Sequence, residues 1–207
     1  LASFHFKSRE IQGLHYAINE VISYAHKNYK IKITKACLAA AGVVSESKDF
    51  VKVTNVKLAV SKKVLLKNTY LKKILLINDF EAVGYGINML AKKDIATIKR
   101  AKKIPKAPII VIGAGTGLGK TTLIYDSGYK SYIPIPSEAG NGDFPAQDHQ
   151  ELELVNFIKK YKKIKQNVSY ERVLSGQGLS NIYSFLRKSK NMPATKHTKE
   201  IQKSGNL

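Results

Sequence analysis

The stretch PIIVIGAGTGLGKTTLIYDSG, from Pro108 to Gly128, decides the fold because two phosphate-binding signatures overlap in it. Residues 114–121, AGTGLGKT, fit a relaxed Walker A loop with alanine in the first glycine position. Residues 113–119, GAGTGLG, fit a Gly-Thr-Gly loop that joins two strands. A Walker A loop leads into a long helix, so the residues that follow Lys120 distinguish the two.

The residues after Lys120, TTLIYDSGYKSYIPI, predict a strand that enters a hairpin. Thr, Ile and Tyr favour β-structure, and the Asp-Ser-Gly of residues 126–128 is typical of a hairpin turn. The glycines of the loop let backbone N–H groups approach a phosphate, and Thr116 adds a hydroxyl. A P-loop NTPase stays as an alternative, which a helix directly after Thr121 would favour, and a purely structural glycine turn is another.

The composition indicates a globular protein with a high positive charge. Of the 207 residues 43% are hydrophobic, which is enough for a sizeable core, and the formal net charge is +20. Only four of the 35 basic residues are arginines and the lysines are dispersed, whereas specific nucleic-acid readers favour the planar arginine fork. Nucleic acid is therefore not the expected partner, and a basic nucleic-acid-binding protein stays as an alternative.

Cysteine usage and hydropathy point to a cytoplasmic protein. The single cysteine, Cys37, excludes an intramolecular disulfide and fits a reducing compartment. Within KACLAAAG it is predicted to be a buried, inert strand residue. The longest apolar runs, such as CLAAAGVV at residues 37–44, are too short to span a bilayer, so no membrane association is expected.

The hydrophobic pattern predicts mixed α/β structure. Helical spacing is found in residues 10–28, 80–90, 149–164 and 171–188. Strands are predicted in residues 32–44, 72–79, 108–113, 120–126 and 129–137. Residues 48–66 alternate and predict extended segments and loops, Ser8 is a candidate N-cap, and the polar tail from Ser189 is expected to be loose.

A basic, polar connector from Lys92 to Pro108 is the candidate domain boundary. It divides the chain into an N-terminal α/β lobe, residues 1–91, and a second, partial α/β lobe, residues 92–207.

Four motifs then follow one another along the chain: INDFEAVGYG (77–86), GAGTGLG (113–119), PSEAGNGDF (136–144) and ERVLSGQGL (171–179). Together they resemble the bacterial-type glucokinase family, within the hexokinase and actin-like ATPase superfamily, over nearly the whole chain. The resemblance implies an α/β, actin-like ATPase (ribonuclease H-like) fold of two lobes with a central cleft. It also implies that glucose in this cleft accepts the γ-phosphoryl group of ATP on its 6-hydroxyl, with Mg²⁺ bridging the phosphates.

The resemblance also assigns roles to individual residues. Asp79 matches the general base of the family, and the alternative is that it N-caps the helix that starts near Glu81. The residues that match sugar-binding positions are Asn78, Asp79, Glu138, Asn141 and Glu171. The residues that match the ATP-binding loop are Gly113, Gly115, Thr116 and Gly117. Carboxylates and amides can hold two vicinal sugar hydroxyls at once, and no residue is assigned to a metal. The alternatives are a first-turn helix acid for Glu171 and a solvated loop acid for Glu138.

The chain departs from the family pattern in its sugar site. The usual EGGH appears as EAGN at residues 138–141, so Asn141 replaces a sugar-contacting histidine, which leaves the sugar preference open.

Two segments of the family pattern are also without a match. The opening DxGGT phosphate loop and the closing adenosine-binding segment are not found, so the fold is expected to be incomplete at both ends. The chain by itself is therefore expected to show no kinase turnover. A catalytically impaired fragment or a sugar-binding pseudoenzyme of the same fold is the alternative to an active kinase. A sheet edge left unpaired would favour self-association, and a homodimer is therefore an open expectation.

Overall fold

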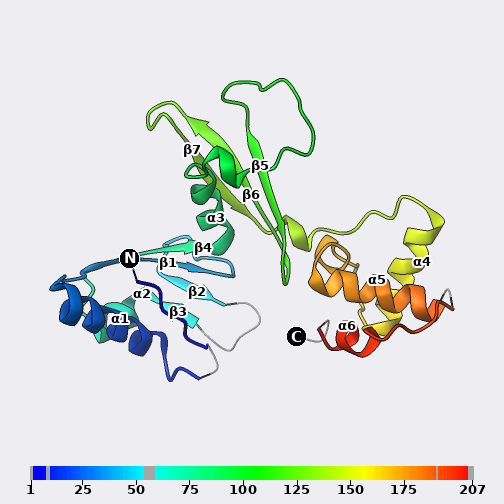
Figure 1. The fold of residues 1–207 in the computed structure, drawn as a ribbon, viewed down its shortest axis with the longest axis horizontal. Helices are drawn as coiled ribbons and strands as arrows, with labels where there is room; N and C mark the ends of the chain where they lie inside the picture. The colour runs from blue at the N-terminus through cyan, green and yellow to red at the C-terminus, as the bar shows by residue number, and fades with distance from the viewer. Residues whose placement is uncertain (1, 8–9, 54–58, 190, 205–207) are drawn as a thin grey trace. The chain divides into compact units, whose positions relative to one another are not determined.

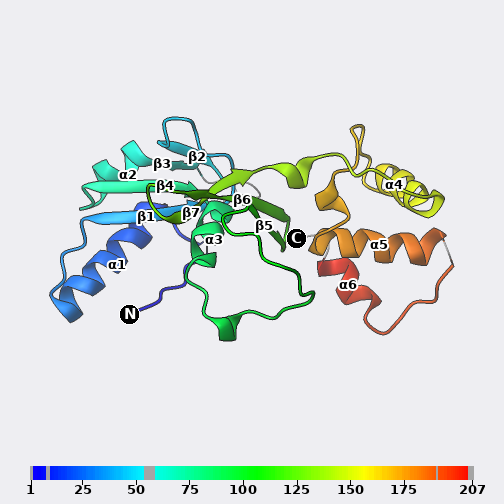
Figure 2. The ribbon, with the colours of Figure 1, turned by 90° about the horizontal axis from the view of Figure 1, so that it is seen from above.

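The computed structural model describes residues 2–7, 10–53, 59–189 and 191–204, and the chain divides into two compact units, Leu1–Met89 and Leu90–Leu207. Figures 1 and 2 show the elements of each unit. The first unit contains α1 (Leu14–Tyr29), β1 (Lys35–Ala40), β2 (Phe50–Lys52), β3 (Ala59–Ser61), α2 (Lys62–Asn68), β4 (Lys73–Asn78) and α3 (Asp79–Ile87). The second contains β5 (Ile109–Ala114), β6 (Leu118–Asp126), β7 (Ser131–Ser137), α4 (His149–Tyr161), α5 (Gly176–Ser189) and α6 (Thr198–Ser204). Short 3-10 turns are η1 (Lys92–Asp94), η2 (Ala139–Asn141) and η3 (Tyr170–Arg172).

The first unit is built on a parallel pair of strands. β1 pairs with β4 in a register that runs from Lys35 opposite Lys73 to Ala40 opposite Asn78. β2 and β3 form a separate antiparallel pair, and α1 and α2 lie side by side, where Asn19 donates a hydrogen bond to the carbonyl of Asn68 at 2.9 Å (Figures 1 and 2). The buried core of this unit consists of Ile22, Val51, Val60, Leu65, Leu71, Ile74 and Leu76. The strand over residues 72–79 and the helix after it are therefore as predicted, and β4 ends directly before Asp79.

Two predictions for the first unit are wrong, and one lies outside the described residues. Residues 62–66 form helix α2 rather than an extended segment, because Ser61 caps its start and Leu65 is buried in the core. Cys37 is exposed, because successive side chains of β1 point to opposite faces of the strand and the neighbouring Ala36 and Leu38 pack against the core. The N-cap predicted at Ser8 falls outside the described residues.

The second unit contains an antiparallel sheet in the order β5-β6-β7. β5 and β6 are joined through residues 115–117, since Ala114 pairs with Leu118. β6 continues through Thr121 to Asp126 and turns into β7, so the predicted hairpin is confirmed. A strand rather than a helix follows Lys120, which rules out the P-loop NTPase alternative.

Helices α4 and α5 enclose the second core. Its buried members are Leu154, Ile158, Val168, Val173 and Phe185. The helix predicted over residues 149–164 ends at Tyr161. The helix predicted over residues 171–188 is split into η3 and α5, because Ser175 uses its side chain to bond both neighbouring turns.

The tail predicted to be loose contains helix α6 instead. Thr198 starts this helix, accepts a hydrogen bond from the Thr195 N–H at 2.8 Å, and bonds the Tyr183 hydroxyl of α5. These tertiary bonds hold a segment whose own sequence is polar. In the part of the chain that the structure describes, no helix is long and apolar enough to cross a membrane.

Candidate functional site

Asn78 forms the junction between β4 and α3. Its Oδ1 accepts hydrogen bonds from the N–H groups of Phe80 at 2.8 Å and Glu81 at 3.2 Å, which makes Asn78 the N-cap of α3. Its Nδ2 donates to the carbonyl of Gly42 at 3.1 Å, and the residue is buried, with 8% of its surface exposed. The side chain is therefore largely used by the fold, and one amide N–H is left for a ligand.

Glu81 completes this cap from inside the helix. Its Oε2 accepts the backbone N–H of Asn78 at 3.4 Å, so the two residues form a reciprocal capping box. The residue is 7% exposed, and the Lys48 Nζ lies 3.8 Å from its Oε1. Sequence reasoning missed this box, although an Asn followed three residues later by Glu was available as its signal.

Asp79 stands next to the cap without serving as it. Its carboxylate accepts one hydrogen bond among the described residues, from the adjacent Phe80 N–H at 3.0 Å, and the residue is half-buried. Most of its lone pairs are therefore available to a proton or a hydroxyl group. The alternative that Asp79 N-caps α3 is wrong, since Asn78 occupies that position.

The predicted phosphate loop is the tip of the β5–β6 hairpin. Gly113 pairs with Gly119, and the Gly115 N–H donates to the Gly117 carbonyl at 2.8 Å, which closes the turn. Thr116 is exposed. Within the described residues the N–H groups of Thr116 and Gly117 donate to no acceptor, so the tip carries two free donors of the kind that bind anions.

Glu171 is held against this loop. Its Oε2 accepts the Leu118 N–H at 3.0 Å, and a methyl group placed on Gly117 would lie 2.4 Å from the same oxygen. The Gly176 N–H donates to the Gly115 carbonyl at 2.9 Å, so the ERVLSG segment contacts the loop at both of its ends. Figures 1 and 2 both show the hairpin tip beside the start of α5.

A buried hydrogen-bond network fixes the turn that carries Glu171. The Ser175 hydroxyl donates to the Glu171 carbonyl at 2.6 Å and accepts the Gly178 N–H at 3.1 Å. Asn181 of α5 donates to the Arg172 carbonyl at 2.9 Å. Ser175 and Asn181 are 3% and 1% exposed, so the position of this turn is set by the core of the unit.

Glu138 immediately precedes η2 and Asn141 is its last residue, and the turn packs against Leu118. Asn141 donates through Nδ2 to Glu138 Oε2 at 3.3 Å, and both residues are exposed. Gly140, between them, is so close to Leu118 that an added methyl group would lie 2.1 Å from the Leu118 carbonyl oxygen. Leu118 therefore contacts both motifs: Gly140 of the EAGN motif packs against its carbonyl oxygen, and Glu171 accepts its N–H.

The structure brings some of the predicted site residues together in the second unit. Glu138, Asn141, Glu171 and the loop of residues 113–117 meet around Leu118. Asn78 and Asp79 lie in the first unit. Among the residues that the structure describes, no three His, Cys, Asp or Glu side chains are grouped as they would be around a metal ion.

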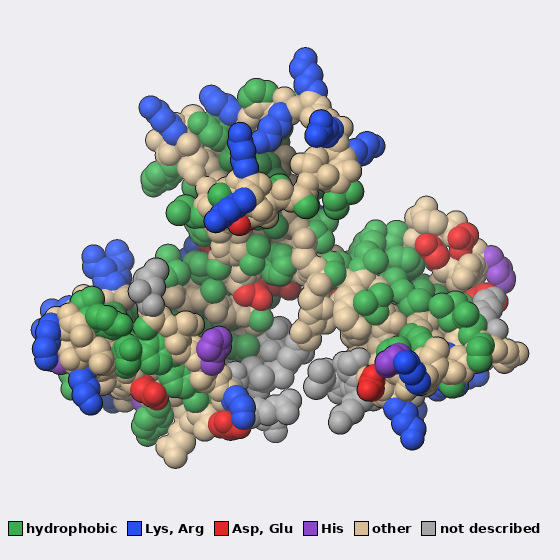
Figure 3. All heavy atoms as spheres, in the orientation of Figure 1, with side chains coloured by type: hydrophobic (Ala, Val, Ile, Leu, Met, Phe, Trp, Pro, Cys, Tyr) green, Lys and Arg blue, Asp and Glu red, His purple; other side chains and the backbone are tan. Residues whose placement is uncertain are grey.

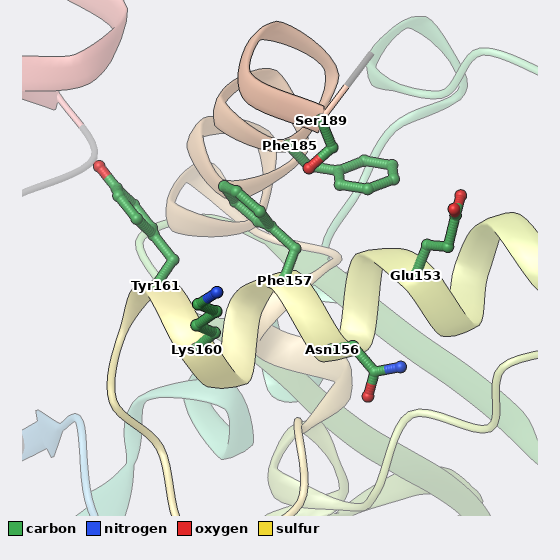
Figure 4. Close-up of a pocket in the computed structure, with 7 residues that line it drawn as sticks. All are labelled: Glu153, Asn156, Phe157, Lys160, Tyr161, Phe185 and Ser189. Atoms are coloured by element: carbon green, nitrogen blue, oxygen red, sulfur yellow. The ribbon is translucent and has the colours of Figure 1, made fainter.

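A separate pocket lies on the helices of the second unit. It has a volume of about 650 Å³, and Figure 4 shows that its lining side chains come from α4 and α5. Phe157 stacks on Tyr161 with ring centroids 5.3 Å apart and contacts Phe185 at 5.6 Å. None of its lining residues is among the predicted site residues.

Basic side chains are scattered on the face of the second unit that Figure 3 shows. Lys and Arg side chains project separately from the outer end of the β5–β7 region, with hydrophobic and polar side chains between them. For the described residues on this face, the continuous basic stripe that the nucleic-acid alternative requires is not seen.

Comparisons with known proteins agree on one family. The family model described as Glucokinase matches residues 2–206. A glucokinase of Nostoc sp. is 44% identical over 156 residues, which are 75% of this chain and 44% of that protein. A glucokinase of Escherichia coli is 32% identical over 197 residues, which are 94% of this chain and 59% of that protein. The chain thus spans about half the length of the curated relatives it matches.

Solved structures give the same fold. A glucokinase from an Antarctic psychrotroph superposes with a TM-score of 0.69 at 25% identity, covering 98% of this chain and 61% of that one. A glucokinase from Balamuthia mandrillaris, solved in complex with glucose, gives a TM-score of 0.67 at 21% identity, covering 93% of this chain and 57% of that one. The predicted α/β, actin-like ATPase fold is confirmed by these neighbours.

Proposed function

The chain belongs to the glucokinase family, and we propose that it transfers the γ-phosphoryl group of ATP to the 6-hydroxyl of glucose. The family resemblance inferred from the four ordered motifs is confirmed by the family match and by the relatives. The substrates and the roles of individual residues are part of the proposal.

One observation carries the proposal: a carboxylate of the sugar motif is bonded to the phosphate loop. Glu171 Oε2 accepts the Leu118 N–H at 3.0 Å, at the end of the loop whose free N–H groups suit a phosphate. A kinase must hold the acceptor hydroxyl and the donor phosphate at reacting distance, and most of its rate gain comes from this positioning. Contact between the two motifs supports such an arrangement.

Asp79 is proposed as the general base. Because Asn78 supplies the helix cap, the Asp79 carboxylate is free to accept the proton of the attacking hydroxyl. The hydroxyl oxygen then forms its bond to the γ-phosphorus, the bond to the β-phosphate oxygen breaks, and ADP leaves.

Glu138 and Glu171 are proposed to accept hydrogen bonds from sugar hydroxyls. Asn141 orients the first carboxylate by donating to its Oε2, and the fixed turn of η3 orients the second. Asn78 contributes at most its remaining amide N–H, since its Oδ1 is bonded in the cap and its other amide N–H donates to the Gly42 carbonyl. A sugar that lacks one of these hydroxyls would leave a carboxylate unpaired and would be rejected.

Mg²⁺ is proposed only as the ion that accompanies the nucleotide. Mg²⁺ in kinases is held largely by substrate phosphates, with one or two protein carboxylates. Among the described residues, no three His, Cys, Asp or Glu side chains are grouped as a metal site. The protein's own contribution at the phosphates is the pair of loop N–H groups at Thr116 and Gly117.

A cytoplasmic location and a homodimer belong to the same proposal. The single cysteine supports the location. The support for a dimer is β1, which pairs only with β4 among the described strands and so leaves a free strand edge.

Calorimetric titration tests the function directly. The purified chain is titrated with glucose and, separately, with Mg-ATP. ADP release is followed by a coupled assay in a protein that also carries the segments by which the relatives are longer. Binding of both ligands supports the proposal, and glucose-dependent ADP release would establish the reaction. Binding of glucose alone would identify a sugar-binding pseudoenzyme, and binding of neither would contradict the proposed function.

A further inference from the structure

We propose that Glu171 is also a positioning residue for the phosphate loop, so that glucose binding and nucleotide binding are coupled through its carboxylate. The inference rests on the proposed function, since it takes glucose and a nucleotide as the two ligands. It adds a regulatory property that the sugar-binding role of Glu171 alone does not imply.

The two carboxylate oxygens of Glu171 have different surroundings. Oε2 accepts the Leu118 N–H at 3.0 Å and lies directly against Gly117. For Oε1, no hydrogen bond is found among the described residues, so this oxygen is the one available to a sugar hydroxyl. One carboxylate can therefore contact the sugar and the loop at the same time.

Glycine at position 117 is what permits this contact. An added methyl group would come 2.4 Å from Oε2 and 3.1 Å from the carboxyl carbon, so any other residue would push the carboxylate away. At Gly115, in the same loop, no atom lies within 4 Å of an added methyl group. The two glycines of the Gly-Thr-Gly turn thus differ in the one contact that links the loop to the sugar motif.

The turn that carries Glu171 is rigid, so sugar binding can affect the phosphate loop and nucleotide binding can affect the sugar site. The turn that carries Glu171 is held by buried Ser175 and Asn181, and the Gly176 N–H bonds the Gly115 carbonyl at 2.9 Å. A sugar hydroxyl on Oε1 would restrict the carboxylate, and the restricted carboxylate would restrict Leu118 and the free N–H groups beside it. A nucleotide then meets a loop that is already ordered, which favours its binding, and the reverse holds by linkage.

The experiment compares the variant Gly117→Ala with the parent chain, and Gly86→Ala is the control, because Gly86 has no assigned role and an added methyl group there meets no atom within 4 Å. Glucose affinity is measured by calorimetry, and the affinity for Mg²⁺ with a non-hydrolysable ATP analogue is measured with and without saturating glucose. In the parent chain we expect glucose to raise the analogue affinity roughly 5-fold or more. The negative charge of Glu171 opposes phosphate binding with and without glucose alike, so the ratio of the two affinities isolates the coupling.

Gly117→Ala should lower glucose affinity roughly 5-fold or more and reduce the coupling ratio to about 1, although the substitution lies in the phosphate loop. Gly86→Ala should change glucose affinity by less than about twofold, because its methyl group meets no atom within 4 Å. A merely structural role for Gly117 would lower stability without removing the coupling, and thermal unfolding of both variants separates that case.

Amide hydrogen exchange at Leu118 gives a second measurement. It uses the parent chain and Glu171 variants, so it does not depend on the folding of Gly117→Ala. We expect glucose to slow this exchange in the parent chain, Glu171→Ala to accelerate it without ligand, and Glu171→Gln, which keeps an acceptor, to restore part of the protection. If glucose binds but changes neither Leu118 exchange nor analogue affinity, the inference is overturned and the proposed function stands. If glucose does not bind, the proposed function itself fails and the inference fails with it.

Discussion

Asn78 caps helix α3 with its side chain, and the adjacent Asp79 carboxylate is left with a single hydrogen bond among the described residues, from the Phe80 N–H. The two neighbours therefore differ in what they do for the fold. Asn78 is buried and has bonds to α3 and to Gly42, whereas Asp79 is half-buried and free to react. A substitution at Asn78 should therefore mainly lower stability, and a substitution at Asp79 should mainly lower the rate of catalysis.

Replacing Asp79 with Asn should abolish phosphoryl transfer and largely spare glucose binding. The amide keeps the shape of the side chain and loses the proton acceptor, so the loss in kcat should be at least about 10²-fold. The measurement is glucose-dependent ADP release, made in a protein that also carries the segments by which the relatives are longer. Near-normal turnover of this variant would show that Asp79 is not the base.

Replacing Asn78 with Ala should destabilise the first unit by roughly 0.5–2 kcal/mol, because α3 loses its N-cap. The lost bond to the Gly42 carbonyl adds to this cost. Urea unfolding monitored by circular dichroism measures the change, and Asp79→Asn is the matched control, with an expected change within about 0.5 kcal/mol. Equal loss of stability in both variants would contradict the division of roles between the two residues.

Replacing Glu138 or Glu171 with Gln should weaken glucose binding without unfolding the chain. Each change replaces a charge-assisted hydrogen bond by a neutral one, a loss of roughly 1–2 kcal/mol in binding free energy. Calorimetry measures the affinity, and Glu46→Gln, at an exposed carboxylate with no assigned role, is the control. Unchanged affinity in both site variants would remove the proposed sugar pocket.

Asn141 should act through Glu138. Asn141→Ala removes the donor at 3.3 Å from Glu138 Oε2, and we expect glucose binding to weaken by roughly 0.5–1.5 kcal/mol. Asn141→His restores a donor, and with it part of the affinity. Asn167 donates to Asp143 at 2.7 Å in a comparable exposed pair, so Asn167→Ala is the control and should leave glucose affinity unchanged. If Asn167→Ala lowered glucose affinity more than Asn141→Ala, the sugar would not bind at Glu138.

The parts of the fold that could be predicted are those whose pattern is local. The β-branched and aromatic run after Lys120 predicted β6, and the Asp-Ser-Gly turn predicted its hairpin with β7. Helices α2 and α6 were missed because they depend on packing from outside their own sequence: Leu65 in the core and Tyr183 on Thr198. Cys37 was placed in the interior because an apolar run does not show which side of a strand is covered.

The candidate site shows the same limit. Motif order predicted which residues belong to the candidate site, but not that Asn78 and Glu81 would form the N-terminal cap of α3. The bond between Glu171 and Leu118 joins residues 53 positions apart, so only the folded second unit brings them together. The packing of Gly140 on the Leu118 carbonyl is likewise a property of the fold and not of either motif.

Replacing Gly140 with Ala should destabilise the second unit and impair its sugar site. The added methyl group would lie 2.1 Å from the Leu118 carbonyl oxygen, and the backbone on both sides would have to move. Over-packing of this kind costs roughly 1–3 kcal/mol, which urea unfolding can measure. Gly115→Ala adds the same methyl group three residues before the start of β6, where no atom lies within 4 Å, and should change stability by less than about 0.5 kcal/mol.

The expected loss of glucose affinity in Gly140→Ala follows from the geometry of a single peptide. Displacing the Leu118 carbonyl also displaces the Leu118 N–H on which Glu171 depends, while Glu138 and Asn141 move with η2. Calorimetry should therefore show weaker glucose binding in this variant than in Gly115→Ala. If both variants match the parent chain in stability and in glucose affinity, the EAGN motif does not pack on Leu118, and the convergence of the three motifs on this residue is wrong.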